Sequence, residues 1–232
     1  MKVGFVGLGN VGSKLAGSLL RNGYEVMVRD LNAAFVADFL ALGASAADSP
    51  KQLAQACDII ITCLPSPAAC SAVMEGTSTE EGVIAGLSDG KIWLEMSTTD
   101  ESEIRRIGAL VKAAGAEPVD CPVSGGCHRA DTGNISIFAG CSRAAFERAL
   151  PVLTTLGRRV LHTGELGTAS KLKVVTNYLA TAHLVALSEA LTACKVMDLD
   201  MNVSYEAIKA SSGNSFVHET ESQVILNGSR DI

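Results

Sequence analysis

Residues 1–12 read Met-Lys-Val-Gly-Phe-Val-Gly-Leu-Gly-Asn-Val-Gly, an apolar strand pattern that continues directly into Gly-x-Gly-x-x-Gly. In this motif Gly7 permits a tight turn, Gly9 lets the backbone approach a ligand, and Gly12 lets the next helix pack against the strand. Because a strand pattern precedes the motif and a helix pattern follows it, we expect a dinucleotide pyrophosphate to bind at the start of that helix. A strand–helix turn without a ligand is the alternative.

An acidic residue follows the second strand pattern. Asp30 lies 18 positions beyond Gly12, directly after the pattern Tyr24–Arg29. A carboxylate there accepts hydrogen bonds from the adenosine ribose and repels a 2′-phosphate. Leu31 follows instead of an arginine, and side-chain alternation predicts that Arg29 points elsewhere. The pattern favours NAD over NADP, with a carboxylate that only begins a turn as the alternative.

Strand and helix patterns alternate through most of the chain, which predicts a mostly parallel sheet with helices on both faces. The strand patterns are Met1–Val6, Tyr24–Arg29, Asp58–Pro65, Lys91–Glu95, Glu117–Asp120, Ile135–Ala139 and Arg159–His162. The main helix patterns are Ala33–Leu42, Glu101–Ala114 and Arg143–Leu153. We therefore predict an α/β protein with a Rossmann-type, doubly wound sheet in residues 1–163.

From Ser170 onward only helix patterns remain, beginning with a long stretch that contains neither Gly nor Pro. We predict an all-α domain in residues 164–232 that starts with a long interdomain helix. This segment contains too few helices to close a core alone. We expect it to be truncated at its C-terminal end or covered by a partner chain.

One lysine on the long helix is a candidate acid–base group. Lys173 and Asn177 are four residues apart and share one helix face, whereas Lys171 points about 200° away from Lys173. The apolar residues around Lys173 are Val174, Val175, Tyr178 and Leu179. Such surroundings would desolvate the amine and lower its pKa from the usual ~10.4. The alternative is an exposed surface lysine.

Three further segments place small or polar groups where strands end. Leu64-Pro65 and Ser97-Thr98 each follow a strand, at the sheet edge where open α/β sheets bind ligands. In Asp120-Cys-Pro-Val-Ser-Gly-Gly126 a hydroxyl precedes two glycines, whose backbone amides suit a substrate carboxylate. A strand end or tight loop with no ligand is the alternative at each place.

Composition limits the class of protein. The net charge of -6 disfavours nucleic acid as a partner, and no uninterrupted apolar run reaches the ~18 residues of a membrane span. Seven cysteines without a Cys-x-x-Cys pair predict free thiols in a reducing cytoplasm. Four scattered histidines match no metal-ligand spacing, so we expect no metal site.

Together these motifs resemble the β-hydroxyacid dehydrogenase family. The matching stretches, in order, are Gly7–Gly12, Leu64-Pro65, Glu95–Thr99, Asp120–Gly126, Gly167…Lys173…Asn177 and Ser211–Gly213. The resemblance implies nucleotide binding by Gly7, Leu8, Gly9, Asn10, Val11, Gly12, Asp30, Leu64, Pro65 and Thr98. It implies that the substrate carboxylate is held by Ser124, Gly125 and Gly126, that Lys173 is catalytic and that Asn177 contacts the substrate.

The function implied is hydride transfer between NAD and a small β-hydroxy acid or its semialdehyde, with Lys173 as general acid and base. An NADPH-dependent semialdehyde reductase and a non-catalytic nucleotide-binding module are the alternatives. The chain departs from the family pattern at Ala169, where a glycine is usual, and at Ala68 and Ala69, near which an asparagine is frequent. It also ends before a further Lys-Asp pair. We expect a homo-oligomer, a dimer or tetramer, because the long apolar helix lacks cover.

Overall fold

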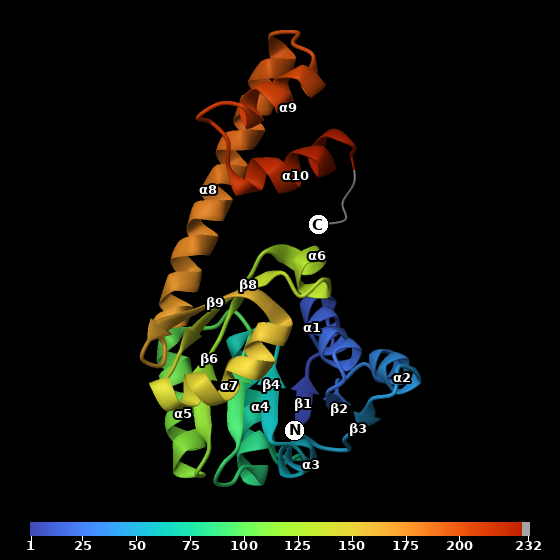
Figure 1. Cartoon of the computed structure of the whole chain (residues 1–232), viewed down its shortest axis with the longest axis vertical. Helices are drawn as coiled ribbons and strands as arrows, with labels where there is room; N and C mark the ends of the chain where they lie inside the picture. Colours follow the sequence, from blue (N-terminus) through green and yellow to red (C-terminus); the bar gives the residue numbers. More distant parts are fainter. Residues whose placement is uncertain (229–232) are drawn as a thin grey trace. The chain divides into compact units, whose positions relative to one another are not determined.

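The structure is a computed structural model in which residues 1–228 are described (Figure 1). The chain divides into two compact units, Met1–Lys173 and a second that begins at Val174. The first unit contains the sheet and the helices that cover it. The second consists of helices only, and helix α8 (Thr168–Val196) runs from one unit into the other.

A nine-stranded sheet forms the centre of the first unit. Six strands are parallel, in the order β3-β2-β1-β4-β5-β6, and β8 continues the sheet antiparallel to β6. The strands are β1 (Lys2–Val6), β2 (Glu25–Arg29), β3 (Ser45–Ala46), β4 (Ile59–Thr62), β5 (Ile92–Glu95), β6 (Glu117–Asp120), β7 (Val123–Ser124), β8 (Ile135–Gly140) and β9 (Gly157–Gly164). The chain reverses its direction of growth between β1 and β4, the place where such sheets bind ligands.

Helices cover both faces of this sheet (Figure 1). They are α1 (Asn10–Arg21), α2 (Ala33–Ala41), α3 (Pro50–Ala56), α4 (Pro67–Glu75), the 3₁₀ turn η1 (Val83–Gly86), α5 (Glu101–Ala113), α6 (Gly126–Asp131) and α7 (Arg143–Leu156). The predicted fold class, a doubly wound, mostly parallel sheet followed by helices, is confirmed.

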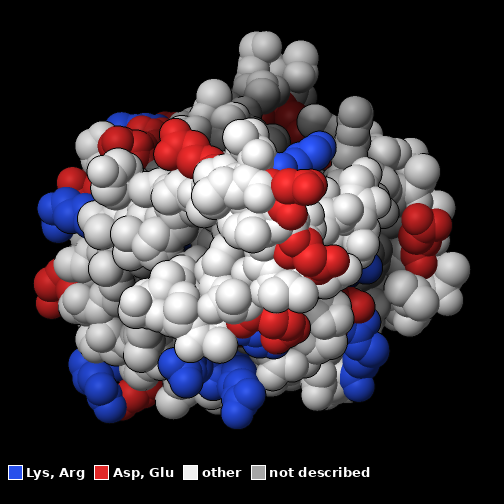
Figure 2. Space-filling view, turned by 90° about the horizontal axis from the view of Figure 1, so that it is seen from above, with Lys and Arg blue, Asp and Glu red and all other residues white. Residues whose placement is uncertain are grey.

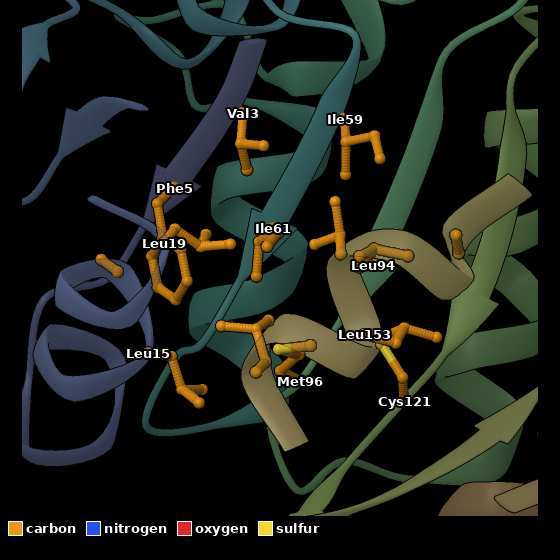
Figure 3. Packing of buried hydrophobic residues seen from close by; sticks show 14 of the residues in the cluster. Val3, Phe5, Leu15, Leu19, Ile59, Ile61, Leu94, Met96, Cys121 and Leu153 are labelled. Atoms are coloured by element: carbon orange, nitrogen blue, oxygen red, sulfur yellow. The ribbon is translucent and has the colours of Figure 1, made fainter. Parts of the chain in front are cut away.

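Alternation along the strands sorts the core into two layers, one on each face. On the first face Phe5 and Ile61 pack with Leu15 of α1 and Leu153 of α7 (Figure 3). On the opposite face Trp93 packs with residues of α3, α4 and α5. Each fully buried Ile or Leu contributes about 1.5–3 kcal/mol to the stability of the fold through the hydrophobic effect. The two layers therefore hold the strands, and with them the strand ends, in place.

The shortest helices and strands were not predicted from the sequence. Strands β3 and β7 have two residues each, and α6 has six, which is too short for a periodic pattern to develop. Helix α4 has nine residues but only Cys70 and Met74 are buried, so its apolar stripe is one turn long. The cap Ser66 and Pro67 at the first helical position are its remaining sequence signal.

The second unit has a small core of its own. Helices α9 (Met201–Lys209) and α10 (Phe216–Leu226) pack with α8. Leu187 and Leu191 of α8 and Val217 of α10 are buried, and Met201 and Ile208 of α9 pack against them. The His218 ring lies 4.8 Å from the Tyr205 ring, centroid to centroid. Within the described residues, α8 is long and apolar enough to cross a membrane, by length and composition alone. It meets this criterion although polar residues interrupt its apolar sequence. Long helices of soluble proteins meet the same criterion.

Surface charge is mixed. On the face shown in Figure 2, acidic and basic side chains are interspersed among uncharged residues. Elsewhere in the described part of the chain, charged side chains form ion pairs, such as Lys51 with Glu81 at 2.8 Å and Arg106 with Glu75 at 2.6 Å. Exposed pairs of this kind each contribute at most about 1 kcal/mol to stability.

Candidate active site

A cavity of about 890 Å³ lies where the carboxyl ends of β1, β2, β4 and β5 meet. Its volume is within the range of about 300–1,000 Å³ that holds cofactors and drug-sized ligands. Every residue that lines it belongs to the first unit. The cavity therefore occupies the switch point of the sheet, as the sequence motifs predict.

Most of the predicted site residues line this cavity. They are Gly7, Gly9, Asn10, Val11, Gly12, Asp30, Leu64, Pro65, Thr98, Ser124, Gly125, Gly126 and Lys173. Leu8 does not, because its side chain is buried in the core on the α1 side of the sheet. Asn177 is an exposed residue of the second unit, and its contact with substrate stays a prediction.

The glycine loop has the backbone geometry that its motif requires. Gly7 has a φ of +96°, and a Cβ on Gly12 would lie 2.0 Å from the Gly7 carbonyl oxygen. Gly9 is the N-cap of α1, and among the described residues no side chain caps this helix. The N–H groups of the first turn are thus available to an anion, which the helix dipole also favours. The loop fits a pyrophosphate.

Asp30 joins the loop to the end of β2. Its Oδ2 accepts a hydrogen bond from the Leu8 N–H at 2.6 Å, and its Oδ1 accepts one from the Asn32 N–H at 2.8 Å. Each carboxylate oxygen keeps a second acceptor position. Asp30 can therefore hold the loop and accept ribose hydroxyls at the same time, as the fit to an adenosine requires.

The prediction that Arg29 points away from the site is wrong. Arg29 lines the same cavity, where it forms an ion pair with Glu80 and donates a hydrogen bond to the Asp48 carbonyl oxygen at 2.7 Å. Strand alternation fixes only the direction of the Cβ, and the long side chain reaches the carbonyl groups that follow β3. Glu80 carried no sequence signal, because it lies in an irregular loop between α4 and η1.

The buried carboxyl group of Glu95 joins the ends of β4 and β5, beside Leu64 and Ser97 of the cavity lining. Glu95 accepts hydrogen bonds from the hydroxyl of Thr62 at 2.6 Å, the thiol of Cys70 at 2.8 Å and the backbone N–H of Ser97 at 2.7 Å. Ser97 Oγ in turn accepts from the Leu64 N–H at 2.8 Å. Burial raises the pKa of Glu95 above its usual value. An acidic residue that ends an apolar strand was the signal available for this role.

Lys173 is buried at the edge of the cavity, with 8% of its surface exposed. The start of its helix is fixed by Asp120, whose carboxylate accepts hydrogen bonds from the Ser170 N–H at 2.8 Å and the Ser170 hydroxyl at 2.7 Å. Burial lowers the pKa of the Lys173 amine below its usual value. An amine with these properties can exchange a proton closer to neutral pH than an exposed lysine.

The source of this burial differs from the prediction. Val174 and Val175 are 57% and 60% exposed, and Tyr178 is 73% exposed, so the apolar helical neighbours do not desolvate the amine. The buried side of the helix start is formed by Ala169 and Ser170, which share the face of Lys173.

The choice between the two lysines is clear from their surroundings. Lys171 is exposed and pairs with Glu101 at 3.0 Å, while Lys173 lines the cavity. The Ser124 loop lies on the same cavity, because β7 pairs with β8 and so holds Ser124 opposite Ser136. His128 in α6 is exposed and lies outside the cavity lining.

Sequence comparison agrees with this geometry. The NAD-binding domain of 6-phosphogluconate dehydrogenase matches residues 2–164, and the NAD-binding domain of NADP-dependent 3-hydroxyisobutyrate dehydrogenase matches residues 167–232. The chain is 34% identical over 226 residues to 2-(hydroxymethyl)glutarate dehydrogenase of Eubacterium barkeri, covering 97% of this chain and 74% of that protein. The chain belongs to the β-hydroxyacid dehydrogenase family.

Two other relatives of this β-hydroxyacid dehydrogenase are informative. The NAD-dependent L-serine dehydrogenase of Pseudomonas aeruginosa is 32% identical over 219 residues, covering 94% of this chain and 72% of that protein. The crystal structure of 3-hydroxyisobutyrate dehydrogenase from Salmonella typhimurium superposes with a TM-score of 0.88 at 30% identity, covering 98% of this chain and 79% of that one. The predicted family is confirmed, and the protein is an NAD(P)-dependent oxidoreductase acting on CH–OH groups.

Proposed function

We propose that this dehydrogenase oxidises a small β-hydroxy acid, or reduces the matching semialdehyde, with NAD as cofactor and Lys173 as general acid and base. One observation carries the proposal. A buried lysine lines the same cavity as the Gly7–Gly12 loop and Asp30. A dinucleotide bound at the loop therefore shares one cavity with an amine whose pKa is lowered by burial.

Each predicted site residue has a task in this proposal. The first turn of α1 binds the pyrophosphate and Asp30 the adenosine ribose. Ser124, Gly125 and Gly126 bind the substrate carboxylate, which orients the substrate. The nicotinamide ring, when bound, supplies the hydride chemistry. Lys173 accepts the hydroxyl proton during oxidation and returns it during reduction, and Asn177 orients the substrate.

Substitution of the lysine tests the proposal. Lys173→Ala is expected to lower kcat by about 10²–10⁴-fold, the usual contribution of a general acid or base, while NAD affinity persists. Lys171→Ala is the matched control, because Lys171 lies two residues away, is exposed and pairs with Glu101. Turnover retained in Lys173→Ala would remove Lys173 from the mechanism.

NAD is the proposed cofactor because Asp30 lines the cavity and Leu31, 97% exposed, offers no positive charge to a 2′-phosphate. The second candidate is an NADPH-dependent semialdehyde reductase. It is favoured by Arg29 on the cavity wall and by the match to an NADP-dependent relative. Comparison of kcat/KM for NADH and NADPH distinguishes them, and Asp30→Ala should relax the preference.

We further propose that the protein acts as a homo-oligomer, a dimer or tetramer, in the cytoplasm. Exposed apolar side chains on α8 support association, since Val174, Val175 and Tyr178 are each more than half exposed. All seven cysteines are free thiols, which suits a reducing compartment. Light scattering after size-exclusion chromatography tests the oligomeric state, and a panel of small hydroxy acids and semialdehydes tests the substrate class.

A further inference from the structure

Charged residues line the cavity at two places. They are Arg29, Asp30, Glu80 and Lys173. Lys173 belongs to α8, whereas Arg29 and Asp30 are adjacent at the end of β2 and Glu80 pairs with Arg29. If a dinucleotide binds as proposed above, the group of three charges surrounds the adenosine ribose, because Asp30 is the ribose ligand. The inference below rests on that proposed function.

The Arg29 guanidinium is held from two sides. Its Nη2 donates to the carboxylate of Glu80, and its Nη1 donates to the Asp48 carbonyl oxygen at 2.7 Å and to the Ala47 carbonyl oxygen at 3.3 Å. The side chains of Arg29 and Glu80 are 19% and 33% exposed. They are therefore screened less by solvent than a pair on the open surface.

The loop that carries Glu80 is itself ordered by hydrogen bonds. The Thr77 N–H donates to the Glu80 carbonyl oxygen at 2.8 Å, and an antiparallel bridge joins Gly76 to Glu81. Because a Cβ on Gly76 would lie 2.5 Å from the Glu80 carbonyl oxygen, the two sides of the loop are in close contact. This geometry turns Glu80 toward Arg29 and Glu81 toward Lys51, which it contacts at 2.8 Å.

We propose that Glu80 determines cofactor selectivity. Its carboxylate neutralises Arg29, so that Asp30 leaves this end of the cavity with net negative charge, and a 2′-phosphorylated ribose is disfavoured. Without the Glu80 charge the three-residue group becomes neutral, and the Arg29 guanidinium gains donors that can reach a phosphate. Selectivity for NAD thus depends on a pair of side chains, one of which lies about 50 residues further along the chain.

The test measures binding, so that it does not depend on turnover. The affinities of NAD⁺ and NADP⁺ are determined by isothermal titration calorimetry, at one fixed ionic strength, for the wild-type protein, Glu80→Gln and Arg29→Met. A unit charge near a phosphate at partial exposure changes affinity by roughly tenfold or more. We expect Glu80→Gln to increase the affinity for NADP⁺ relative to NAD⁺ by about tenfold. We expect Arg29→Met to decrease this ratio of affinities.

Two further variants complete the design. Glu81→Gln removes the same charge one residue away, from a side chain that is 66% exposed, pairs with Lys51 and lies outside the cavity lining. It should leave the ratio of the two affinities unchanged. In the double variant Arg29→Met/Glu80→Gln the gain for NADP⁺ should disappear, because the phosphate then has no cation to bind.

The outcomes separate selectivity from a structural role. If Arg29 and Glu80 only hold the loop, Glu80→Gln and Arg29→Met weaken both cofactors alike and the ratio stays within twofold of Glu81→Gln. That result, or a gain for NADP⁺ that survives in the double variant, overturns the proposal. Failure of the wild-type protein to bind either dinucleotide overturns the proposed function instead, and the two failures are therefore distinguishable.

Discussion

Ser170 holds the carboxylate of Asp120 with two hydrogen bonds, one from its backbone N–H at 2.8 Å and one from its hydroxyl at 2.7 Å. Asp120 is fully buried at the end of β6, and Ser170 lies in the first turn of α8. A carboxylate at a helix amino terminus also interacts favourably with the helix dipole. The proposed catalytic residue Lys173 follows three positions later, so the position of its amine depends on this contact.

Removal of the contact should lower both stability and turnover. Asp120→Ala leaves the Ser170 N–H buried without its acceptor, which costs about 1–3 kcal/mol. We expect a loss of that size in urea unfolding and a decrease in kcat. Ser170→Ala keeps the backbone hydrogen bond and should lose only about 0.5–1.5 kcal/mol. Equal effects of the two substitutions would show that the backbone contact does not matter.

The pH dependence of turnover should report on Lys173. Because burial lowers the pKa of the Lys173 amine, the neutral form that accepts a proton becomes available below the pH range of ordinary lysines. Oxidation is therefore expected to accelerate as the pH rises through this lowered pKa, and reduction, which requires the ammonium form, to slow over the same range. Steady-state rates in both directions from pH 6 to 10.5 measure this. Parallel profiles in the two directions would contradict the assignment.

Alanine substitutions at two glycines of the loop should affect folding and NAD binding separately. A Cβ on Gly12 would lie 2.0 Å from the Gly7 carbonyl oxygen, so Gly12→Ala should lower the melting temperature markedly. A Cβ on Gly9 meets nothing within 4 Å, and the φ of Gly9 is -66°, which suits alanine. Gly9→Ala should therefore fold normally and bind NAD more weakly, because the Cβ intrudes on the pyrophosphate. Calorimetry of unfolding and of binding measures both effects.

The buried Glu95 should make stability depend on pH. Burial raises the pKa of Glu95 in the folded state, so the folded protein keeps this proton where the unfolded chain, with a pKa of about 4.3, has lost it. Its contribution to stability is complete below that unfolded value and declines as the pH rises above it.

Glu95→Gln, which cannot titrate, should accordingly show a shallower decline of unfolding free energy above pH ~4.3. Asp120, whose pKa burial also raises, leaves a residual slope in this variant. Urea unfolding between pH 4.5 and 8 compares the two proteins. Superimposable slopes would show that Glu95 does not titrate in this range.

Much of the site could be predicted because it depends on local backbone rules. The Gly7–Gly12 loop and Asp30 each directly follow a parallel strand, Ser124 comes four residues after the end of β6, and the carboxyl ends of parallel strands meet at one edge. Lys173 could be distinguished from Lys171 because helical geometry allows only one of them to face the cavity. These inferences require only that the strands are parallel and that the helix has a known phase, and the sequence pattern predicts both.

The remaining features depend on contacts between distant segments. Glu80 lies in a loop without periodicity, and only its approach to Arg29 gives it a role. Strand alternation could not predict the position of the Arg29 guanidinium, since four rotatable bonds separate it from the Cα. The exposure of Val174 and Val175 was equally inaccessible, because helical spacing identifies neighbours on a helix and not what covers them.

The chain contains a single tryptophan, Trp93, which is fully buried in β5. The Trp93 indole N–H donates to Thr62 Oγ1 at 2.8 Å, and the same hydroxyl donates to Glu95 at 2.6 Å. The fluorescence of Trp93 consequently comes from one buried environment, in which two successive hydrogen bonds connect the indole to the Glu95 carboxyl group. Fluorescence spectroscopy can therefore follow unfolding of the unlabelled wild-type protein through the emission of one residue.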